Sequence, residues 1–217
     1  TVADMQAFMQ ALLSENQLRI FAFGNYDKAD LDNAVALVKG ALPENRTSVN
    51  YDMREFWQPQ AEQTLVWQQD LSVADVALID VMVHPTPGFD TRAAGTVLRG
   101  HFRTVAFDKL RTEEQLVYAV GGMATSIGDY TGFAMFIQTP VKDVAAMQAR
   151  FDEFKTQYKV ALDALTEEEF AKLKTSALVS LKEAPKNMRD EVVPFISDWY
   201  REKYDFDSEQ KLIAAVE

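Results

Sequence analysis

The stretch FDKLRTEEQLVYAV, residues 107–120, is the point where a predicted helix ends and a predicted strand begins. Arg111 carries a permanently charged, fork-shaped set of N–H donors. Tyr118 is a phenol on the same predicted strand face as Leu116 and Val120, because side chains two apart in a strand share a face. General physical chemistry makes Arg111 a helix-end or carboxylate-pairing residue and Tyr118 a half-buried strand aromatic.

Around this stretch, helical and strand patterns follow one another in an order typical of an α+β fold. A helix is predicted from about residue 90 to 110, between two pairs of strands at 64–68 with 73–83 and at 115–124 with 131–138. The rest is predicted to be helical, in pieces that begin near Asp143, Thr166, Asn187 and Ser208. Short turns between paired strands favour an antiparallel or mixed sheet with helices packed mainly on one face.

The first 61 residues have a different organisation. A helix at 2–13 precedes a short apolar run at 18–23, which reads as a strand closed by Gly24-Asn25. Asp27 or Asp30 can cap a second helix that ends before Pro43. Residues 43–61 are polar without a sustained period, which is typical of a linker.

Composition limits the classes of function. The 217 residues include 33 acidic and 22 basic side chains, which give a formal charge of −11. A chain with this charge repels nucleic-acid phosphates and anionic lipids, so no nucleic-acid and no membrane partner is expected. The absence of Cys excludes disulfides, thiolate metal sites and thiol nucleophiles, and no apolar run approaches the ~20 residues that span a bilayer.

The sequence lacks the usual catalytic motifs. Its two histidines are His84, in a Pro-rich turn, and His101, on a predicted helix, and neither belongs to an H-E-x-x-H or H-x-x-E-H motif. A catalytic zinc needs more ligands than this pair offers, so no metal site and no cofactor site is expected in this chain. There is no G-x-S-x-G motif. Gly121-Gly122 lacks a phosphate-binding pattern and is interpreted as a bulge or bend.

Residues 107–120 resemble the L-R-[ST]-x-E-Q-L-G-Y-x-V motif of the pitrilysin/insulinase (insulin-degrading enzyme) family of zinc metallopeptidases. Weaker similarity covers most of the chain, at residues 21–25, 133–138, 166–170, 184–186, 199 and 204–207. The family has four related α+β repeats in two halves that close around a chamber. The resemblance places this chain in the C-terminal, non-catalytic half, whereas the zinc and its H-x-x-E-H motif belong to the first repeat.

The resemblance also implies a division of the chain. Residues 1–45 correspond to the closing helix-strand-helix of the preceding repeat, 46–61 to a linker, and 62–217 to the fourth repeat, truncated at its C-terminus. The implied partners are the N-terminal catalytic half of the same polypeptide and peptide substrates. Bacterial members are commonly periplasmic, which favours the periplasm over the cytoplasm.

The resemblance assigns roles to two residues. The family's fourth repeat supplies an Arg and a Tyr seven positions apart, and Arg111 and Tyr118 have this spacing. By resemblance, Tyr118 donates a hydrogen bond to the oxyanion of the tetrahedral intermediate, and Arg111 holds a substrate backbone carbonyl. Val117 departs from the family pattern, because it places a β-branched side chain where the family has Gly.

Three hypotheses for the function remain open from the sequence. The chain is part of an active zinc metalloendopeptidase, or of a catalytically inactive relative that serves as a binding or assembly subunit. A weaker third hypothesis is an unrelated α+β domain for a small ligand. The chain alone is expected to be inactive. The sequence also leaves open whether residues 18–23 pair with an edge of the 64–138 sheet or remain a separate element.

Overall fold

The computed structural model describes residues 1–44, 46–49, 60, 63–70, 72–140 and 143–217. The chain forms two compact units. The first unit comprises Thr1–Trp57 and Pro185–Tyr204, and the second comprises Gln58–Ala184 and Asp205–Glu217.

The second unit contains an antiparallel sheet of three strands in the order β3-β5-β4. These are β3 (Val76–Val83), β4 (Ala119–Ile127) and β5 (Tyr130–Thr139). The central strand β5 pairs with both neighbours in an unbroken register. The two-residue turn between β4 and β5 begins with Gly128 at a φ of 59°, a conformation that glycine adopts without strain.

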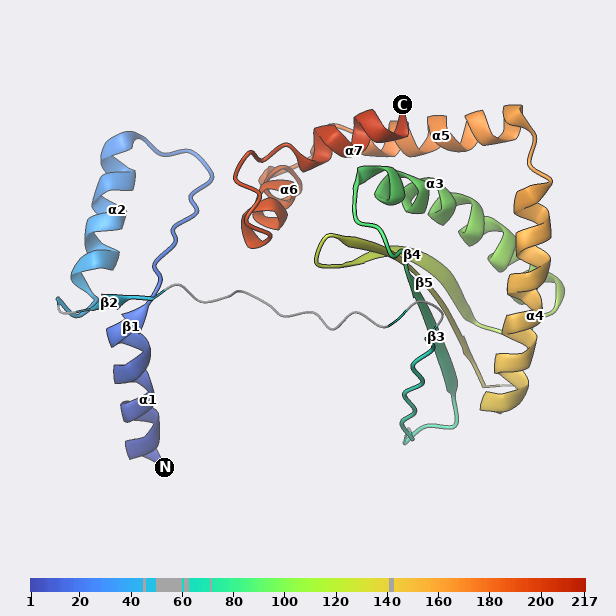
Figure 1. Ribbon diagram of the computed structural model, residues 1–217, viewed down its shortest axis with the longest axis horizontal. Coiled ribbons are helices and arrows are strands. Elements are labelled where there is room, and N and C mark those ends of the chain that lie inside the picture. Colours follow the sequence, from blue (N-terminus) through green and yellow to red (C-terminus); the bar gives the residue numbers. More distant parts are fainter. Residues whose placement is uncertain (45, 50–59, 61–62, 71, 141–142) are drawn as a thin grey trace. The chain divides into compact units, whose positions relative to one another are not determined.

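Helices cover one face of this sheet (Figure 1). Helices α3 (Phe89–Ala106) and α4 (Val144–Asp163) pack on the sheet, while α5 (Glu167–Leu181) and α7 (Ser208–Val216) pack against α3. A π-helical segment, η1 (Phe107–Glu113), continues α3. The predicted α+β fold, with an antiparallel sheet and helices on one face, is confirmed.

The core of the second unit lies between the sheet and the two helices that pack on it. Phe102 of α3 is fully buried and meets Phe133, Phe154 and Tyr158 edge-on, with ring centroids 5.1 to 5.9 Å apart. Edge-to-face packing adds roughly 0.5–1.5 kcal/mol per pair to the free energy gained by burial. This aromatic cluster packs helices α3 and α4 against strand β5 of the sheet.

The Gly121-Gly122 pair is not the predicted bulge or bend, because the β4–β5 ladder runs through it in regular register. The two glycines make room for aromatic rings instead. A Cβ on Gly121 would lie 2.8 Å from the ring of Phe136, and a Cβ on Gly122 would lie 2.6 Å from Phe133 and 2.7 Å from Phe102. Close approach of side chains from neighbouring elements, and not a break in the strand, explains both residues.

The first unit consists mainly of three helices: α1 (Val2–Ser14), α2 (Lys28–Gly40) and α6 (Met188–Tyr200). The short strands β1 (Glu15–Asn16) and β2 (Thr47–Ser48) pair in parallel. Asp27 caps α2, and its side chain accepts a hydrogen bond from the N–H of Asp30, which confirms the predicted start of this helix.

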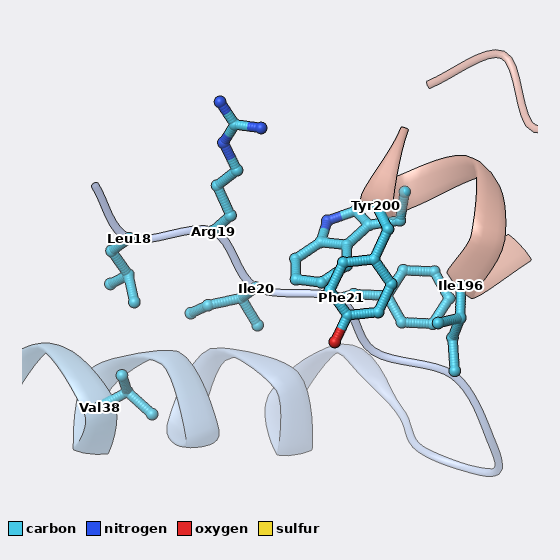
Figure 2. Close-up of a pocket in the computed structure, with 8 residues that line it drawn as sticks. Leu18, Arg19, Ile20, Phe21, Val38, Ile196 and Tyr200 are labelled. Atoms are coloured by element: carbon cyan, nitrogen blue, oxygen red, sulfur yellow. The ribbon is translucent and has the colours of Figure 1, made fainter. Parts of the chain in front are cut away.

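Residues 18–23 do not form the predicted strand. They run extended along a pocket of about 430 Å³, where Leu18 and Ile20 point toward Val38 of α2 while Phe21 lies near Ile196 and Tyr200 of α6 (Figure 2). Residues 18–23 are not among the strands of either sheet that the structure describes. The apolar run reflects packing between two helices, a pattern that cannot be told from a buried strand by sequence alone.

Two further strand predictions are corrected. Residues 64–68 form no strand, and Leu65, Val66 and Trp67 are 63 to 85% exposed, so the segment has neither a ladder nor a core to pack on. The strand predicted at 115–124 begins only at Ala119, because the preceding residues still close the helix end.

The predicted division of the chain differs in one respect from the compact units. Pro185–Tyr204 belongs to the first unit, although the sequence groups it with residues 62–217. Within the predicted linker, Thr47–Ser48 forms β2, and residues 50–59 and 61 lie outside the described residues. The assignment of these segments to particular repeats stays a prediction.

Candidate functional site

The π-helical segment η1 presents Arg111. The N–H of Glu114 donates to the carbonyl of Lys109 at 3.1 Å, five residues back instead of the four of an α-helix. Leu110 is only 1% exposed and anchors the segment in the core. Gln115 then adopts a positive φ of 52°, and the chain turns toward β4. Single π-helical turns are frequent at functional sites, so this geometry makes the segment a candidate.

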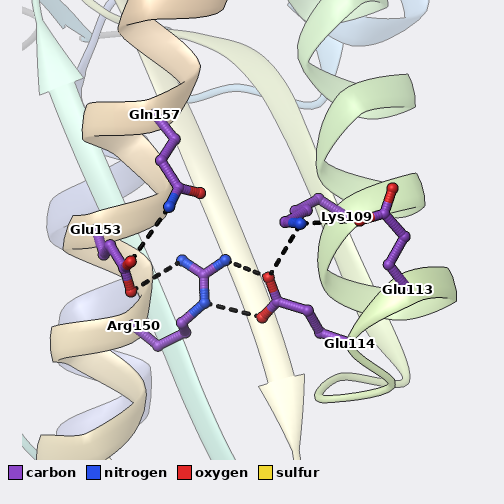
Figure 3. Close-up of polar contacts among 6 residues, drawn as sticks. All are labelled: Lys109, Glu113, Glu114, Arg150, Glu153 and Gln157. Atoms are coloured by element: carbon purple, nitrogen blue, oxygen red, sulfur yellow. Dashed lines mark hydrogen bonds and ion pairs between the residues drawn. The ribbon is translucent and has the colours of Figure 1, made fainter.

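An ion-pair network ties the end of η1 to α4 (Figure 3). Glu114 accepts two hydrogen bonds from Arg150, one from Nε at 2.8 Å and one from Nη2. Lys109 donates to Glu113 at 2.8 Å and lies 3.9 Å from Glu114. The hydrogen bond to Glu114 raises the pKa of Arg150, against the opposing effect of burial. A bidentate pair of this kind fixes both the position and the orientation of the segment that leads to Tyr118.

Arg111 has an exposed side chain whose guanidinium carbon lies 4.9 Å from the centre of the Phe107 ring. It makes no hydrogen bond or ion pair with any residue that the structure describes. Of the two general expectations for Arg111, the helix-end position is the one observed, because Arg111 lies in the last turn of η1. The ring contact orients the guanidinium and leaves its N–H donors available to a ligand.

Tyr118 lies at the end of the sheet, one residue before β4, with 44% of its surface exposed. Its hydroxyl donates to Oδ2 of Asp75, and Gln138 Nε2 donates to the same oxygen at 2.9 Å. The hydrogen bond to Asp75 is the main cause that raises the pKa of Tyr118, with burial and the negative charge of Asp75 adding to it. The phenol is therefore protonated at neutral pH and able to donate.

Strand alternation does not extend across residues 116–120 as predicted. Leu116 and Val120 pack against the buried core, whereas Tyr118 is exposed and bonds to Asp75. Val117 is 5% exposed and belongs to the core cluster. The alternation fails because the regular strand begins only at Ala119.

Arg111 and Tyr118 thus belong to a short segment, residues 110–118, that is fixed to the rest of the second unit. Leu110 and Val117 anchor it in the core, and Glu114 ties it to α4. The structure gives no direct contact between the two site residues. It places both side chains at the surface, where each offers N–H or O–H donors suited to a carbonyl oxygen or an oxyanion.

The two histidines are separate and have local partners. The N–H of Thr86 donates to Nδ1 of His84 at 3.1 Å, and the hydroxyl oxygen of Tyr158 lies 2.9 Å from Nδ1 of His101. Among the described residues, no three His, Cys, Asp or Glu side chains gather into a group that could hold a metal ion. The described residues therefore do not fit a zinc site. None of the described helices is both long and apolar enough to cross a lipid bilayer.

Asp75 and Gln138, which meet at Tyr118, were not predicted from the sequence as its partners. Asp75 stands just before β3, and Gln138 is an amide near the end of an otherwise largely apolar strand. A polar residue in such a strand is a signal for a specific contact, because burial of an unpaired amide is unfavourable. The sequence alone does not show that the two meet, since 63 residues separate them.

Comparison with known proteins identifies relatives of this chain. Residues 97–196 match the family model described as PQQ synthase PqqF-like, C-terminal lobe domain 4. "Protease 3" of Salmonella typhi is 26% identical over 221 residues, an alignment that covers 100% of this chain and 22% of the relative. The chain thus spans about a fifth of the length of this curated relative.

Solved structures give the same result. The crystal structure of pitrilysin is similar with a TM-score of 0.60 and 26% identity over 67% of this chain and 16% of that chain. The periplasmic protease PqqL from Escherichia coli is similar in fold alone, with a TM-score of 0.59 and 10% identity over 89% of this chain and 21% of PqqL. Together with the motif at residues 107–120, these matches support the assignment of the chain to the pitrilysin family, as a segment of its C-terminal half.

Proposed function

We propose that this chain is part of the C-terminal half of a zinc metalloendopeptidase, where it helps to form the substrate chamber and contacts bound peptide. In this proposal the zinc is held by the N-terminal catalytic half of the same polypeptide, outside this chain. The matched Protease 3 and pitrilysin support a peptidase. The similarity to PqqL, which is named as periplasmic, supports the periplasm as the compartment.

The observation that carries the proposal is the contrast between the site residues and their neighbours. Leu110 and Val117 are 1% and 5% exposed, whereas Arg111 and Tyr118, the residues next to them, are both exposed. Exposed donors on a segment that is anchored on both sides are pre-positioned for a ligand, because binding then costs little conformational entropy.

The open face of the sheet supports a role in the chamber wall. The helices cover one face, and on the opposite face Ile79, Val81 and Met123 are 50 to 69% exposed. These residues belong to β3 and β4, the strands on either side of β5. An apolar sheet face next to a donor-rich sheet end suits an extended peptide with apolar side chains.

Each site residue has a distinct chemical role in the proposed reaction. The Tyr118 hydroxyl donates to the oxygen that gains negative charge when water attacks the scissile carbonyl. Arg111 binds a carbonyl of the substrate backbone and fixes the register of the peptide. Donors can stabilise developing charge from another domain than the one that holds the metal, provided that they are pre-oriented.

The test is steady-state peptide cleavage by the full-length protein. Tyr118→Phe should lower kcat by ~10²-fold or more with little change in stability, the usual effect of losing an oxyanion donor. Arg111→Ala should lower kcat/KM to a similar extent. Tyr26→Phe is the matched control, because Tyr26 is also 44% exposed and its hydroxyl donates only to a backbone carbonyl. Arg99→Ala serves likewise for Arg111, since Arg99 is an exposed arginine of α3.

Wild-type kinetics in both site variants would return Arg111 and Tyr118 to purely structural roles. A catalytically inactive binding subunit, the alternative hypothesis, would give a different outcome. Its wild-type form would bind peptide without turnover, and Arg111→Ala would weaken that binding.

A further inference from the structure

Three residues from different parts of the chain meet at one end of the sheet. Gln138 on the central strand is in register with Ala77 of β3 and with Ala119 of β4. Asp75 lies two residues before Ala77, and Tyr118 immediately precedes Ala119. The sheet register therefore brings a carboxylate, an amide and a phenol to the same place.

Two side-chain hydrogen bonds among these three residues converge on one oxygen. Oδ2 of Asp75 accepts the Tyr118 hydroxyl and the Gln138 Nε2–H, the latter at 2.9 Å. The backbone N–H of Tyr118 donates to the carbonyl oxygen of Gln138 at 3.1 Å. Gln138 thus holds Asp75 through its side chain and Tyr118 through its backbone. Gln138 belongs to the central strand, so both partners are bonded to a strand that pairs with a neighbour on each side.

The chemistry of the groups fixes the direction of each hydrogen bond. A phenol has one hydrogen to donate, and an ionised carboxylate can only accept. Hydrogen bonds to ionised groups are roughly twice as strong as neutral ones. Asp75 therefore restrains the ring of Tyr118, a residue that is 44% exposed.

We propose that Asp75 is a positioning residue for Tyr118, held in place by Gln138, and that it sets the location from which the phenol oxygen reaches the substrate. This inference rests on the proposed function, because it requires Tyr118 to contact the reacting carbonyl. Before the reaction the hydroxyl hydrogen is donated to Asp75, which sets the position of the ring. When negative charge develops on the substrate, rotation about the Cζ–Oη bond moves this hydrogen from Asp75 to the substrate oxygen. Asp75 itself touches no substrate and acts only through Tyr118.

A residue that acts only through Tyr118 makes a specific prediction for double variants. Removal of Asp75 can reduce activity no further than removal of the Tyr118 hydroxyl does. In a protein that already lacks this hydroxyl, loss of Asp75 should have no additional effect on kcat. Residues with separate roles would instead show multiplicative losses.

The experiment measures kcat and KM for peptide cleavage by the full-length protein and four variants: Asp75→Ala, Asp75→Asn, Tyr118→Phe and the double variant Asp75→Ala/Tyr118→Phe. Asp75→Ala should lower kcat roughly tenfold with KM nearly unchanged, a part of the ~10²-fold loss expected for an oxyanion donor. Asp75→Asn keeps an acceptor oxygen and should recover most of the rate. The double variant should match Tyr118→Phe. Multiplicative losses in the double variant, or a higher kcat in either single Asp75 variant, would overturn the proposal.

A second measurement reports on the contact without using activity. ¹⁹F NMR of 3-fluorotyrosine placed at position 118 gives the pKa of that phenol in the full-length protein. This pKa should fall in Asp75→Asn, because the carboxylate raises the pKa of Tyr118. An unchanged pKa would overturn the contact itself. Wild-type kinetics in Tyr118→Phe together with a lowered pKa in Asp75→Asn would refute the proposed role of Tyr118 while leaving the contact intact, so the two failures are distinguishable.

Discussion

Gly122→Ala tests the packing on which the whole second unit depends. The added methyl carbon would lie 2.6 Å from Cζ of Phe133 and 2.7 Å from Cδ1 of Phe102. Ordinary contacts between carbon atoms are about 3.5–4.0 Å, so both rings would have to retreat by about 1 Å. Neither ring has free space, because Phe102 is fully buried and Phe133 is 6% exposed.

The expected magnitude follows from two opposing terms. Overpacking a dense core reduces stability by about 1–3 kcal/mol. Alanine in a strand recovers about 0.5–1 kcal/mol, because it loses less backbone entropy than glycine on folding. The net loss of about 1–2 kcal/mol should lower the Tm by roughly 2–8 °C, given 2–4 °C per kcal/mol for a chain of this size.

Thermal unfolding followed by circular dichroism provides the assay, with Gly100→Ala as the matched control. Gly100 lies in α3, is exposed, and has no atom within 4 Å of a Cβ added there. This control should raise the Tm slightly, since alanine favours a helix by about 0.5–1 kcal/mol. A Tm for Gly122→Ala equal to or above that of the wild type would refute the reasoning. In a Phe133→Leu background the same change should be less destabilising, because the nearest ring is gone.

Three further predictions concern the rest of the second unit and metal binding. Arg150→Met should lower the free energy of unfolding by about 1–3 kcal/mol in urea titrations, because it leaves Glu114, 22% exposed, without its bidentate partner. Glu153→Gln, 62% exposed and paired with Arg150 at 3.6 Å, should change it by less than about 0.5 kcal/mol. Burial lowers the folded-state pKa of His101 below its ordinary 6.5. The contribution of neutral His101 to the free energy of unfolding is therefore present above pH 6.5 and is lost as pH falls through the lowered pKa. His101→Gln should flatten the dependence of unfolding free energy on pH between about 5 and 7, and an unchanged slope would contradict this. Calorimetry of the isolated chain with zinc should reveal no tight one-to-one site, and the chain alone should cleave no peptide, since its described residues offer no metal-ligand cluster.

Helix starts could be predicted from sequence because their determinants are local. Asp27, Asp143, Thr166 and Asn187 each accept a hydrogen bond from a backbone N–H three residues later, as capping requires. At Thr166, where a helix is predicted to begin, the structure has a full capping box, with Glu169 accepting a hydrogen bond from the N–H of Thr166. Such bonds depend on a few adjacent residues, so one sequence contains the information.

Strands were predicted less accurately than helix starts, because a strand forms only when it pairs with a neighbouring strand. Residues 18–23 and 64–68 have the same apolar character as residues 76–83, yet only the last segment pairs with a neighbour. The π-helical end of α3 also had no visible signal. It delays β4 to Ala119, since the N–H of Leu116 is still used by the carbonyl of Leu110 at 2.9 Å.

In the candidate site, the residues could be predicted from the sequence but their exposure could not. The seven-residue spacing of Arg111 and Tyr118 is visible in the sequence, but its structural meaning is not. The π-helical turn, the positive φ of Gln115 and the late start of β4 together keep both side chains exposed while Leu110 and Val117 are buried. If any of these features were shifted by one residue along the chain, a buried position would become exposed and an exposed one buried. The position of Tyr118 therefore depends on tertiary contacts, and among the described residues Asp75 makes the hydrogen bond to the phenol.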